Sequence, residues 1–390
     1  MLRYNTKRLF ENRYAKLAPV ACLLLVFLAL LLSSSLNNSF YYHSGEMMFL
    51  GYSYLKDGNS FNPHGIPILS YIVSAVPLLF MDVNYPENMD FDNPKVFGQA
   101  EFLYYGNNDA KSFVFWSTIP FMLFGLMIGI LVFVWARQLY GYNAGLFALT
   151  LFAFSPVMLA YSWTILPDIM LAGLMLLSMY CFWRFYKNPK PLTLVLCAVF
   201  FGLALATKPT SMFLLIIFLA VGIIGICRKD FIRHLGRNRI ISLALMLAII
   251  FIIGTAVFVG VYINEIHPVY TDSDPMYKNA GYARSNERLD ILIDKLPVTS
   301  DFGKSAMDYL ITRFPVPAPH FIQGLYSTNT IVASGKDAFF MGDYYLGTKW
   351  KLYTLIFMMK NSIPFLILLF LVIALLKWNM PEDRMSLYLI

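Results

Sequence analysis

The sequence predicts an all-α polytopic membrane protein, and three observations lead to that fold class: composition, long apolar runs and the placement of basic residues. Of the 390 residues, 58% are hydrophobic and only 14% are charged. The mean hydropathy is +0.60. Soluble domains of this length rarely reach such values. We therefore expect most of the chain to lie in a lipid bilayer.

About eight transmembrane helices are expected, because eight apolar runs approach the length needed to cross a bilayer. The runs cover roughly 18–36, 115–136, 143–161, 168–185, 192–207, 211–227, 241–263 and 361–378. Pro209 separates the fifth run from the sixth. The first run is expected to stay as an anchor, since no clear cleavage site follows it. Counts of seven and nine helices also fit the pattern.

Lys and Arg precede the first run and recur in every second connection, at Arg137, Arg184, Lys187, Lys190, Arg228, Lys229, Arg233, Arg237, Arg239, Lys377 and Arg384. Basic connections face the cytoplasm. This predicts a multi-pass protein of the cytoplasmic (inner) membrane with a cytoplasmic N-terminus. Two long loops, roughly 37–114 and 264–360, then lie on the outer, non-cytoplasmic side of the membrane. The net charge of +7 follows from the same bias, so nucleic-acid binding is not expected.

Several kinds of site are excluded by residue placement. None of the four cysteines falls in the two long loops, so a disulfide framework or CxxC metal site is not expected. The five histidines lack the i, i+4 spacing of a helical zinc pair. The chain has no Walker loop and no strand-borne GxGxxG motif. The sequence therefore gives no support for nucleotide binding.

The first long loop combines ionisable side chains with a short apolar run. His43 and Glu46 share one face if their segment is helical. The run Ile66–Phe80, interrupted by prolines, is too short to span and predicts an interfacial helix that walls a cavity. The second loop is rich in Tyr, Phe and Trp. These rings can stack on sugars, or they can form an interfacial belt and the loop's own core.

Five segments in order resemble the C-type-fold membrane glycosyltransferases that use polyprenyl-phosphate sugars, such as protein O-mannosyltransferases and the lipid A aminoarabinose transferase. The segments are Gly51–Gly58 with Asn62-Pro63, Ala136–Gly141 with Phe154-Ser155-Pro156, Leu166-Pro167-Asp168, Gly202–Lys208, and Phe340–Gly342 through Trp350 to Lys360–Pro364. Each segment alone is a weak match to the family, and together the five segments extend over most of the chain.

The resemblance implies transfer of a sugar from a polyprenyl-phosphate donor to a hydroxyl acceptor on the outer face of the membrane, with inversion. The acceptor class, whether protein, lipid or cell-envelope glycan, and the sugar stay undefined. No cofactor is required by the resemblance, and a divalent metal is compatible with it. The bilayer itself is the other expected partner, and binding of nucleic acid is not expected.

The resemblance also selects catalytic candidates: His43, Glu46 and Asp168. His43 stands where the family carries an aspartate, and this departure has three readings. Histidine is itself a competent base that Glu46 orients or replaces. Alternatively the site has decayed, or Glu46 occupies the family's acidic position in a shifted register. Asp168 matches a family acid, although an acid at a helix start also satisfies the helix dipole.

Phosphate-binding candidates are Lys208, Lys360, Arg313 and His64. Lys208 and Lys360 match family lysines at the outer ends of helices, where lysines also simply extend to the interface. Arg313 offers a guanidinium fork for phosphate. His64 belongs to an altered form of the family's Glu-His-Pro-Pro element.

The whole chain, 1–390, is treated as one transferase-like module. Its last residues, Met385–Ile390, are apolar but too few to cross, which predicts a missing C-terminal part or a partner chain that supplies further helices. Two other functions stay open. One is a catalytically degenerate homologue that binds lipid-linked glycans or a partner. The other is a transporter of lipid-linked glycans, which predicts mid-membrane charges and inverted repeats that are not evident in the sequence.

Overall fold

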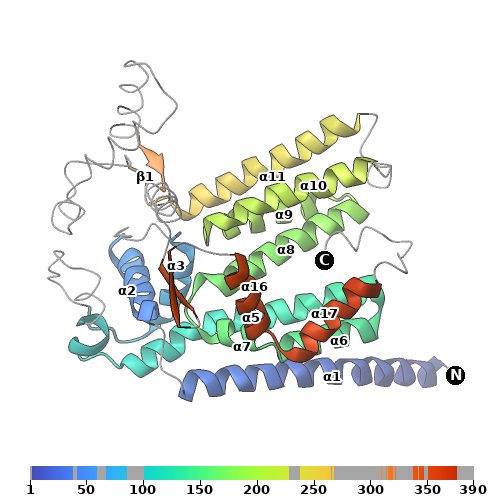
Figure 1. Cartoon of the computed structure of the whole chain (residues 1–390), viewed down its shortest axis with the longest axis horizontal. Helices are drawn as coiled ribbons and strands as arrows, with labels where there is room; N and C mark the ends of the chain where they lie inside the picture. Colours follow the sequence, from blue (N-terminus) through green and yellow to red (C-terminus); the bar gives the residue numbers. More distant parts are fainter. Residues whose placement is uncertain are drawn as a thin grey trace.

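A computed structural model describes residues 2–37, 42–58, 67–85, 101–227, 238–264 and 350–375, with short stretches between 266 and 346. Its helices run roughly side by side, with α1 (Leu2–Asn37) along one edge and α11 (Arg239–Val261) along the other (Figure 1). The chain turns back at each end of this array. The N-terminus lies at one end, and α2 (Tyr42–Asp57) lies at the other.

The remaining elements follow in chain order between these two edges. They are α3 (Leu69–Ala75), η1 (Val76–Phe80), η2 (Glu101–Tyr105), α5 (Ala110–Tyr140), α6 (Tyr142–Ala153), α7 (Pro156–Trp163), α8 (Pro167–Lys187), α9 (Pro191–Leu205), η3 (Pro209–Met212), α10 (Phe213–Cys227), α16 (Trp350–Lys360) and α17 (Ile363–Leu375).

The all-α polytopic fold is confirmed, and each of the eight apolar runs contains helix. Among the residues that the structure describes, five helical segments are long and apolar enough to cross a membrane, and up to seven are if each of two bent pairs is one span. The prediction of about eight therefore exceeds this count. The difference is α9, whose 15 residues fall short of the roughly 20 that a bilayer core requires. It packs between α8 and α11 nevertheless.

Two of the predicted spans are broken rather than straight. The run at 143–161 forms α6 and α7, which bend by 63° at Phe154-Ser155. The Ser155 side chain accepts a hydrogen bond from the Met158 N–H, and Pro156 follows as the first helical residue, so the helix restarts here. The run at 361–378 begins at a second break, where α16 and α17 bend by 117°. Helix α16 falls within the predicted loop 264–360.

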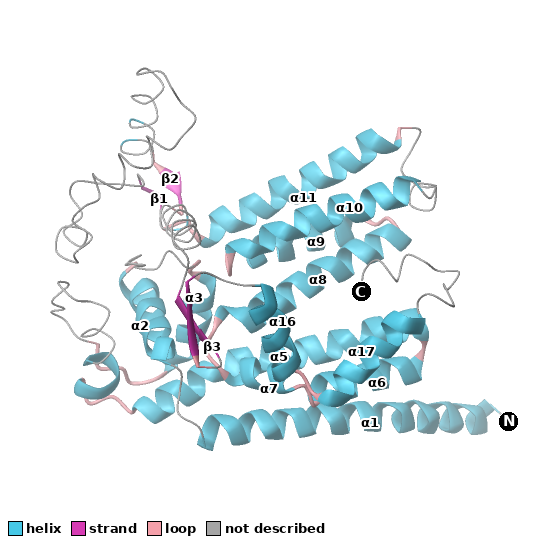
Figure 2. Ribbon diagram, viewed as in Figure 1, coloured by secondary structure: helices cyan, strands magenta, loops and turns pink. Residues whose placement is uncertain are grey.

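Two short antiparallel pairs add β-structure that the sequence did not predict. Strand β1 (Ile266–His267) pairs with β2 (Val316–Pro317), and β3 (Asp337–Phe340) pairs with β4 (Asp343–Leu346) (Figure 2). All four strands belong to the second long loop. At two to four residues each, they are too short to change the fold class.

The first long loop folds into a helical unit. The apolar run predicted as a helix is helical from Leu69 to Phe80, as α3 and η1. Helix α2 is buried over most of its length, from Ser44 to Tyr54. A Cβ added to Gly51 of α2 would lie 2.0 Å from the Tyr71 carbonyl oxygen of α3. Only glycine permits this approach of the two helices.

Three hydrogen bonds fasten this unit to the ends of α9 and α11. The Leu69 N–H donates to the Ala206 carbonyl oxygen at 3.2 Å. The Ile68 N–H donates to the Tyr262 hydroxyl oxygen at 3.0 Å, and the Tyr54 hydroxyl donates to the Val261 carbonyl oxygen at 3.3 Å. Because the first N–H groups of a helix need outside partners, the bonds from Ile68 and Leu69 fix where α3 begins.

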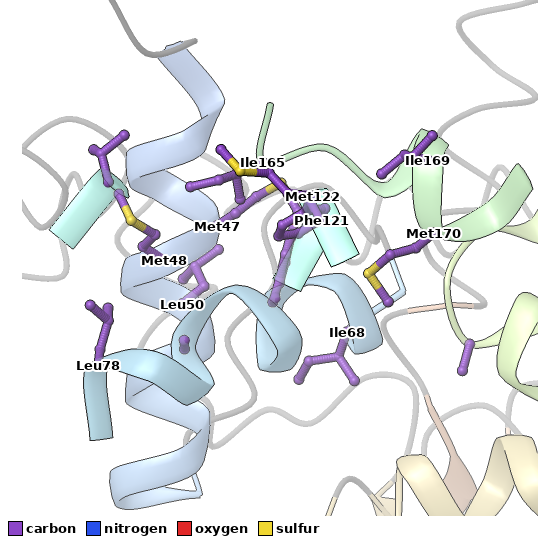
Figure 3. Packing of buried hydrophobic residues seen from close by; sticks show 14 of the residues in the cluster. Met47, Met48, Leu50, Ile68, Leu78, Phe121, Met122, Ile165, Ile169 and Met170 are labelled. Carbon is purple, nitrogen blue, oxygen red and sulfur yellow. The ribbon is translucent and has the colours of Figure 1, made fainter. Parts of the chain in front are cut away.

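Apolar packing extends from the loop helices into the bundle. Met47, Phe121, Met122, Ile165 and Ile169 belong to one buried cluster that joins α2, α5 and the start of α8 (Figure 3). A second cluster lies among α8, α9, α10 and α11. There, a Cβ added to Gly202 of α9 would lie 2.3 Å from the Gly254 carbonyl oxygen of α11. Small residues let membrane helices approach this closely.

Candidate functional site

The first turn of α2 holds a histidine and a carboxylate in contact. His43 Nδ1 and Glu46 Oε2 are 3.1 Å apart, as the i, i+3 spacing predicts. The Glu46 side chain is only 7% exposed, whereas that of His43 is 44% exposed. A buried carboxylate therefore supports an imidazole that reaches the surface. In the tautomer with a proton on Nδ1, the ring donates to Glu46 and keeps Nε2 as its basic nitrogen.

Tyr71 of α3 lies in the electrostatic field of Glu46. Burial raises the pKa of Tyr71 above its ordinary value of 10.0, and the negative charge of Glu46 raises this pKa further. The close approach at Gly51 keeps α2 and α3 together here. Tyr71 therefore stays a neutral hydroxyl. Sequence reasoning missed it, because an apolar helix with one tyrosine gives no sign of which residue it faces.

A second pair forms at the start of α8. Asp168 lies in the first turn, after Pro167, and its Oδ1 accepts a hydrogen bond from Lys208 Nζ at 2.9 Å. Lys208 comes from the connection between α9 and η3. The two side chains are 42% and 37% exposed, respectively. Asp168 thus holds a lysine that reaches water, and it interacts favourably with the helix dipole.

Both pairs lie at the end of the bundle away from the N-terminus. Met47 follows Glu46, Ile169 follows Asp168, and both belong to the same buried cluster, as does Ala206, two positions before Lys208. Met47 approaches Ile165 from α2, and Ile169 and Met170 extend from α8 (Figure 3). The apolar cluster thus connects the elements that carry the two pairs.

Of the other phosphate-binding candidates, only Lys360 is placed relative to the two pairs, and it lies apart from them. Lys360 ends α16 and lines a cavity that none of His43, Glu46, Asp168 and Lys208 lines. Arg313 is exposed in the second long loop. His64 lies outside the described residues. Their roles as phosphate ligands stay predictions.

The Lys360 cavity has a volume of about 630 Å³ and lies where the two broken helices meet. Its walls are mostly apolar and come from α6, α7, α16 and α17; the lining residues are Ala148, Leu151, Phe152, Ser155, Val157, Met158, Tyr353, Ile356, Phe357, Lys360, Asn361 and Phe365. The Ser155-Pro156 sequence could have indicated the break in α6–α7. No local sequence feature indicates that this break faces Lys360.

Within the described parts of the chain, no group of three or more His, Cys, Asp or Glu side chains could hold a metal ion. The two pairs can perform proton transfer and charge stabilisation. A carboxylate-supported imidazole suits general base catalysis, and an ammonium held by a carboxylate suits stabilisation of an anion.

Residues 112–258 match the family model described as dolichyl-phosphate-mannose-protein mannosyltransferase. The match extends from the start of α5 to near the end of α11, which is less than half of the chain. It includes Asp168 and Lys208 but not His43, Glu46 or Lys360. No curated protein sequence matches the chain. The family match and the apolar helices support a membrane glycosyltransferase of the mannosyltransferase type.

Proposed function

We propose that this chain, similar over its central helices to dolichyl-phosphate-mannose-protein mannosyltransferases, transfers a sugar from a polyprenyl-phosphate donor to a hydroxyl acceptor at the membrane face opposite its N-terminus. One observation carries the proposal. The half-exposed His43 is supported by the buried Glu46 at the end of the bundle where the Asp168–Lys208 pair also lies.

In the proposed reaction, His43 is the general base. Its Nε2 takes the proton of the acceptor hydroxyl while the acceptor oxygen attacks the anomeric carbon of the donor. The bond between that carbon and the phosphate oxygen breaks, its electron pair stays on the phosphate, and the anomeric configuration inverts. Glu46, 3.1 Å from Nδ1, orients the ring and stabilises the imidazolium that forms.

Lys208 is the proposed partner of the leaving phosphate. A compact ammonium suits the charge that develops on phosphate oxygens as the bond breaks. Asp168 fixes the direction of this side chain, since Lys208 Nζ donates to Asp168 Oδ1 at 2.9 Å. Asp168 then acts as a positioning residue for Lys208.

The orientation follows from basic residues. Arg137, Arg184, Lys187 and Lys190 lie at the ends of α5 and α8 or before α9, on the side of the N-terminus. Because basic connections stay in the cytoplasm, this supports a cytoplasmic N-terminus and an outer site. Lipid-linked donors suit that side, where no nucleotide sugar is supplied.

The test uses purified full-length protein in lipid nanodiscs with labelled polyprenyl-phosphate sugars and hydroxyl acceptors, and it measures release of polyprenyl phosphate. His43→Gln should lower turnover by about 10²- to 10⁴-fold, the usual contribution of a general base. His43→Asp should retain most of the activity, because it supplies a carboxylate base at the same position.

Asp82→Asn is the matched control, because Asp82 is an exposed carboxylate of the same loop. Its turnover should equal that of the unmodified chain. If the unmodified protein binds donors but never releases polyprenyl phosphate, the degenerate-homologue reading replaces this proposal. If His43→Gln is fully active, the base is another group.

A further inference from the structure

Hairpin β3–β4 carries two aromatic rings on its surface. Phe339 of β3 pairs with Tyr344 of β4, and the two ring centroids are 4.9 Å apart. Gly342 lies in the turn at φ 96°, a conformation that favours glycine. Phe339 is 63% exposed and Tyr344 is 82% exposed. The described parts of the chain therefore leave both rings largely uncovered.

Helix α16, which follows the hairpin, lies near the middle of the bilayer. Its residue Tyr353 lines the same cavity as Phe152 of α6. The Phe152 ring packs on that of Phe27 at a centroid distance of 5.3 Å, and Phe27 is at the centre of the span Lys16–Asn37. The chain changes direction by 117° between α16 and α17, so α16 runs across the bundle instead of outward (Figure 1). Its start at Trp350 therefore lies at about the same depth as its end.

The length of the intervening chain limits how far the hairpin can lie from that depth. Tyr344 is six residues before Trp350, and six extended residues reach at most about 21 Å. The headgroups of a bilayer end about 20 to 22 Å from its middle. Tyr344 therefore cannot lie beyond the headgroups, and the Phe339 ring is in contact with it. Strand β3 lies level with the C-terminal end of α1, at the end of the bundle that carries α2 (Figure 2).

The backbone of the hairpin limits its depth from the other side. Among the described residues, β3 and β4 form a sheet of two strands. The outer edges of such a sheet present N–H and C=O groups that no further described strand pairs with. The hydrocarbon core does not tolerate such groups, whereas the hydrated headgroup region does. Only the zone between hydrocarbon and water satisfies both limits, and aromatic rings are enriched in that zone.

We infer that hairpin β3–β4 is a lipid-binding anchor. Phe339 and Tyr344 lie in the headgroup region of the leaflet at the α2 end of the bundle, and their rings contact the first carbons of the acyl chains. The anchor fixes the start of α16 relative to the membrane surface and so helps to hold this helix across the bundle. It does not depend on the proposed transferase reaction. Stacking of the same rings on a sugar is the alternative that the experiment separates from it.

The experiment measures the depth of a fluorophore attached to a single cysteine. Phe339→Cys and Tyr344→Cys are made in the full chain with its four native cysteines replaced by serine, labelled with NBD and placed in lipid nanodiscs. Lys111→Cys is the control for water, because Lys111 is an exposed charged residue. Phe370→Cys is the control for the hydrocarbon core, because Phe370 is exposed on the apolar helix α17.

The emission of both hairpin labels should be shifted to shorter wavelength than that of the Lys111→Cys label, and iodide should quench them less. A lipid with a nitroxide near its headgroup should quench them more strongly than a lipid with a nitroxide at the chain end. The reverse order should hold for Phe370→Cys, and the same reverse order in the hairpin labels would overturn the inference. Hairpin labels as accessible to iodide as the Lys111→Cys label also overturn it. A shift of their emission by soluble oligosaccharide would then assign the rings to sugar binding.

Two double variants test whether the Tyr344 ring holds the hairpin at this depth. In the Phe339→Cys background, Tyr344→Asp should expose the label to iodide, because a carboxylate is costly beside hydrocarbon. Tyr344→Trp should leave the label protected, since tryptophan also favours the interface. Equal iodide quenching in the two double variants would contradict the anchoring role. The readout is depth rather than turnover, so failure of the proposed transferase activity does not affect it.

Discussion

At the scale of single residues, the two carboxylates of the candidate site have different surroundings. Glu46 is buried beside His43 and near Tyr71, while Asp168 is half-exposed and bound to Lys208. The contact of His43 with Glu46 could be predicted from sequence, because three residues separate them on one helix. The contact of Asp168 with Lys208 could not, since 40 positions separate them and only the packing of α8 on α9 brings them together.

The Asp168–Lys208 pair is expected to matter for activity and little for stability. An exposed ion pair contributes at most about 1 kcal/mol, so Asp168→Asn and Lys208→Met should leave the melting temperature almost unchanged. Each should lower turnover about 100-fold, the usual effect of removing one charge-stabilising donor. Turnover and thermal unfolding of both variants and of the double variant check this. A double variant no slower than either single one supports a shared role, whereas loss of folding would contradict it.

Tyr71 gives a prediction about alkaline stability. Its pKa is raised in the folded protein, so above pH 10 the folded state keeps a proton that the unfolded state loses. The stabilising contribution of the neutral hydroxyl is present below pH 10 and falls as the pH rises further. The free energy of unfolding should decrease about 1.4 kcal/mol per pH unit more steeply in the unmodified chain than in Tyr71→Phe. Denaturant unfolding at pH 9 to 11 measures the difference, and parallel curves would contradict it.

At the scale of elements, apolar length predicted where helices occur but not where they bend. The run at 143–161 contains Ser155-Pro156, and a serine followed by proline is a helix-start signal within an apolar stretch. The bend of α16 on α17 has a similar local cause in Asn361-Ser362-Ile363-Pro364. The predicted loop 264–360 includes α16, because the last apolar run long enough to be counted as a span begins only at 361. Hydropathy does not distinguish a broken span from a span and a loop.

The approach of α2 to α3 can be tested at Gly51. Gly51→Ala should destabilise the protein by about 3 kcal/mol, because the new Cβ would lie 2.0 Å from the Tyr71 carbonyl oxygen and must push the helices apart. It should also lower turnover, since Glu46 and Tyr71 move with these helices. Thermal unfolding and turnover are the measurements.

Gly260→Ala is the control for Gly51→Ala. A Cβ at Gly260, within α11, would meet nothing within 4 Å. Alanine is the better helix former, so this variant should be equally stable or more stable, by up to about 1 kcal/mol. Equal losses in the two glycine variants would show that the close approach does not limit stability.

At the scale of the whole molecule, the orientation predicted from basic residues can be measured directly. Lys111 begins α5 at the α2 end of the bundle, and Lys187 ends α8 at the other; both are exposed. A membrane-impermeant maleimide should label Lys111→Cys in intact cells and Lys187→Cys only after permeabilisation. The chain with its four native cysteines replaced by serine is the background. The reverse pattern would move the site to the cytoplasm and remove the basis for an outer-face reaction.

Composition and charge asymmetry predicted the fold class and the end of the bundle at which the pairs lie. They could not predict the cavity at Lys360, because its walls come from two breaks about 200 positions apart. The resemblance extended over more of the chain than the family match, which lies between α5 and α11. The positions of His43, Glu46 and Lys360 are therefore supported by the packing of the structure and not by the family match.

The bonds from Ile68 and Leu69 to Tyr262 and Ala206 constrain the order of assembly during synthesis. Ile68 and its partner Tyr262 lie 194 positions apart, so this bond can form only after α5 through α11 have been synthesised. The His43–Glu46 contact is local to α2 and can form early, but its position in the bundle is reached only late in translation. An arrested nascent chain that ends before α11 would therefore carry both residues of the pair without the surface that orients them.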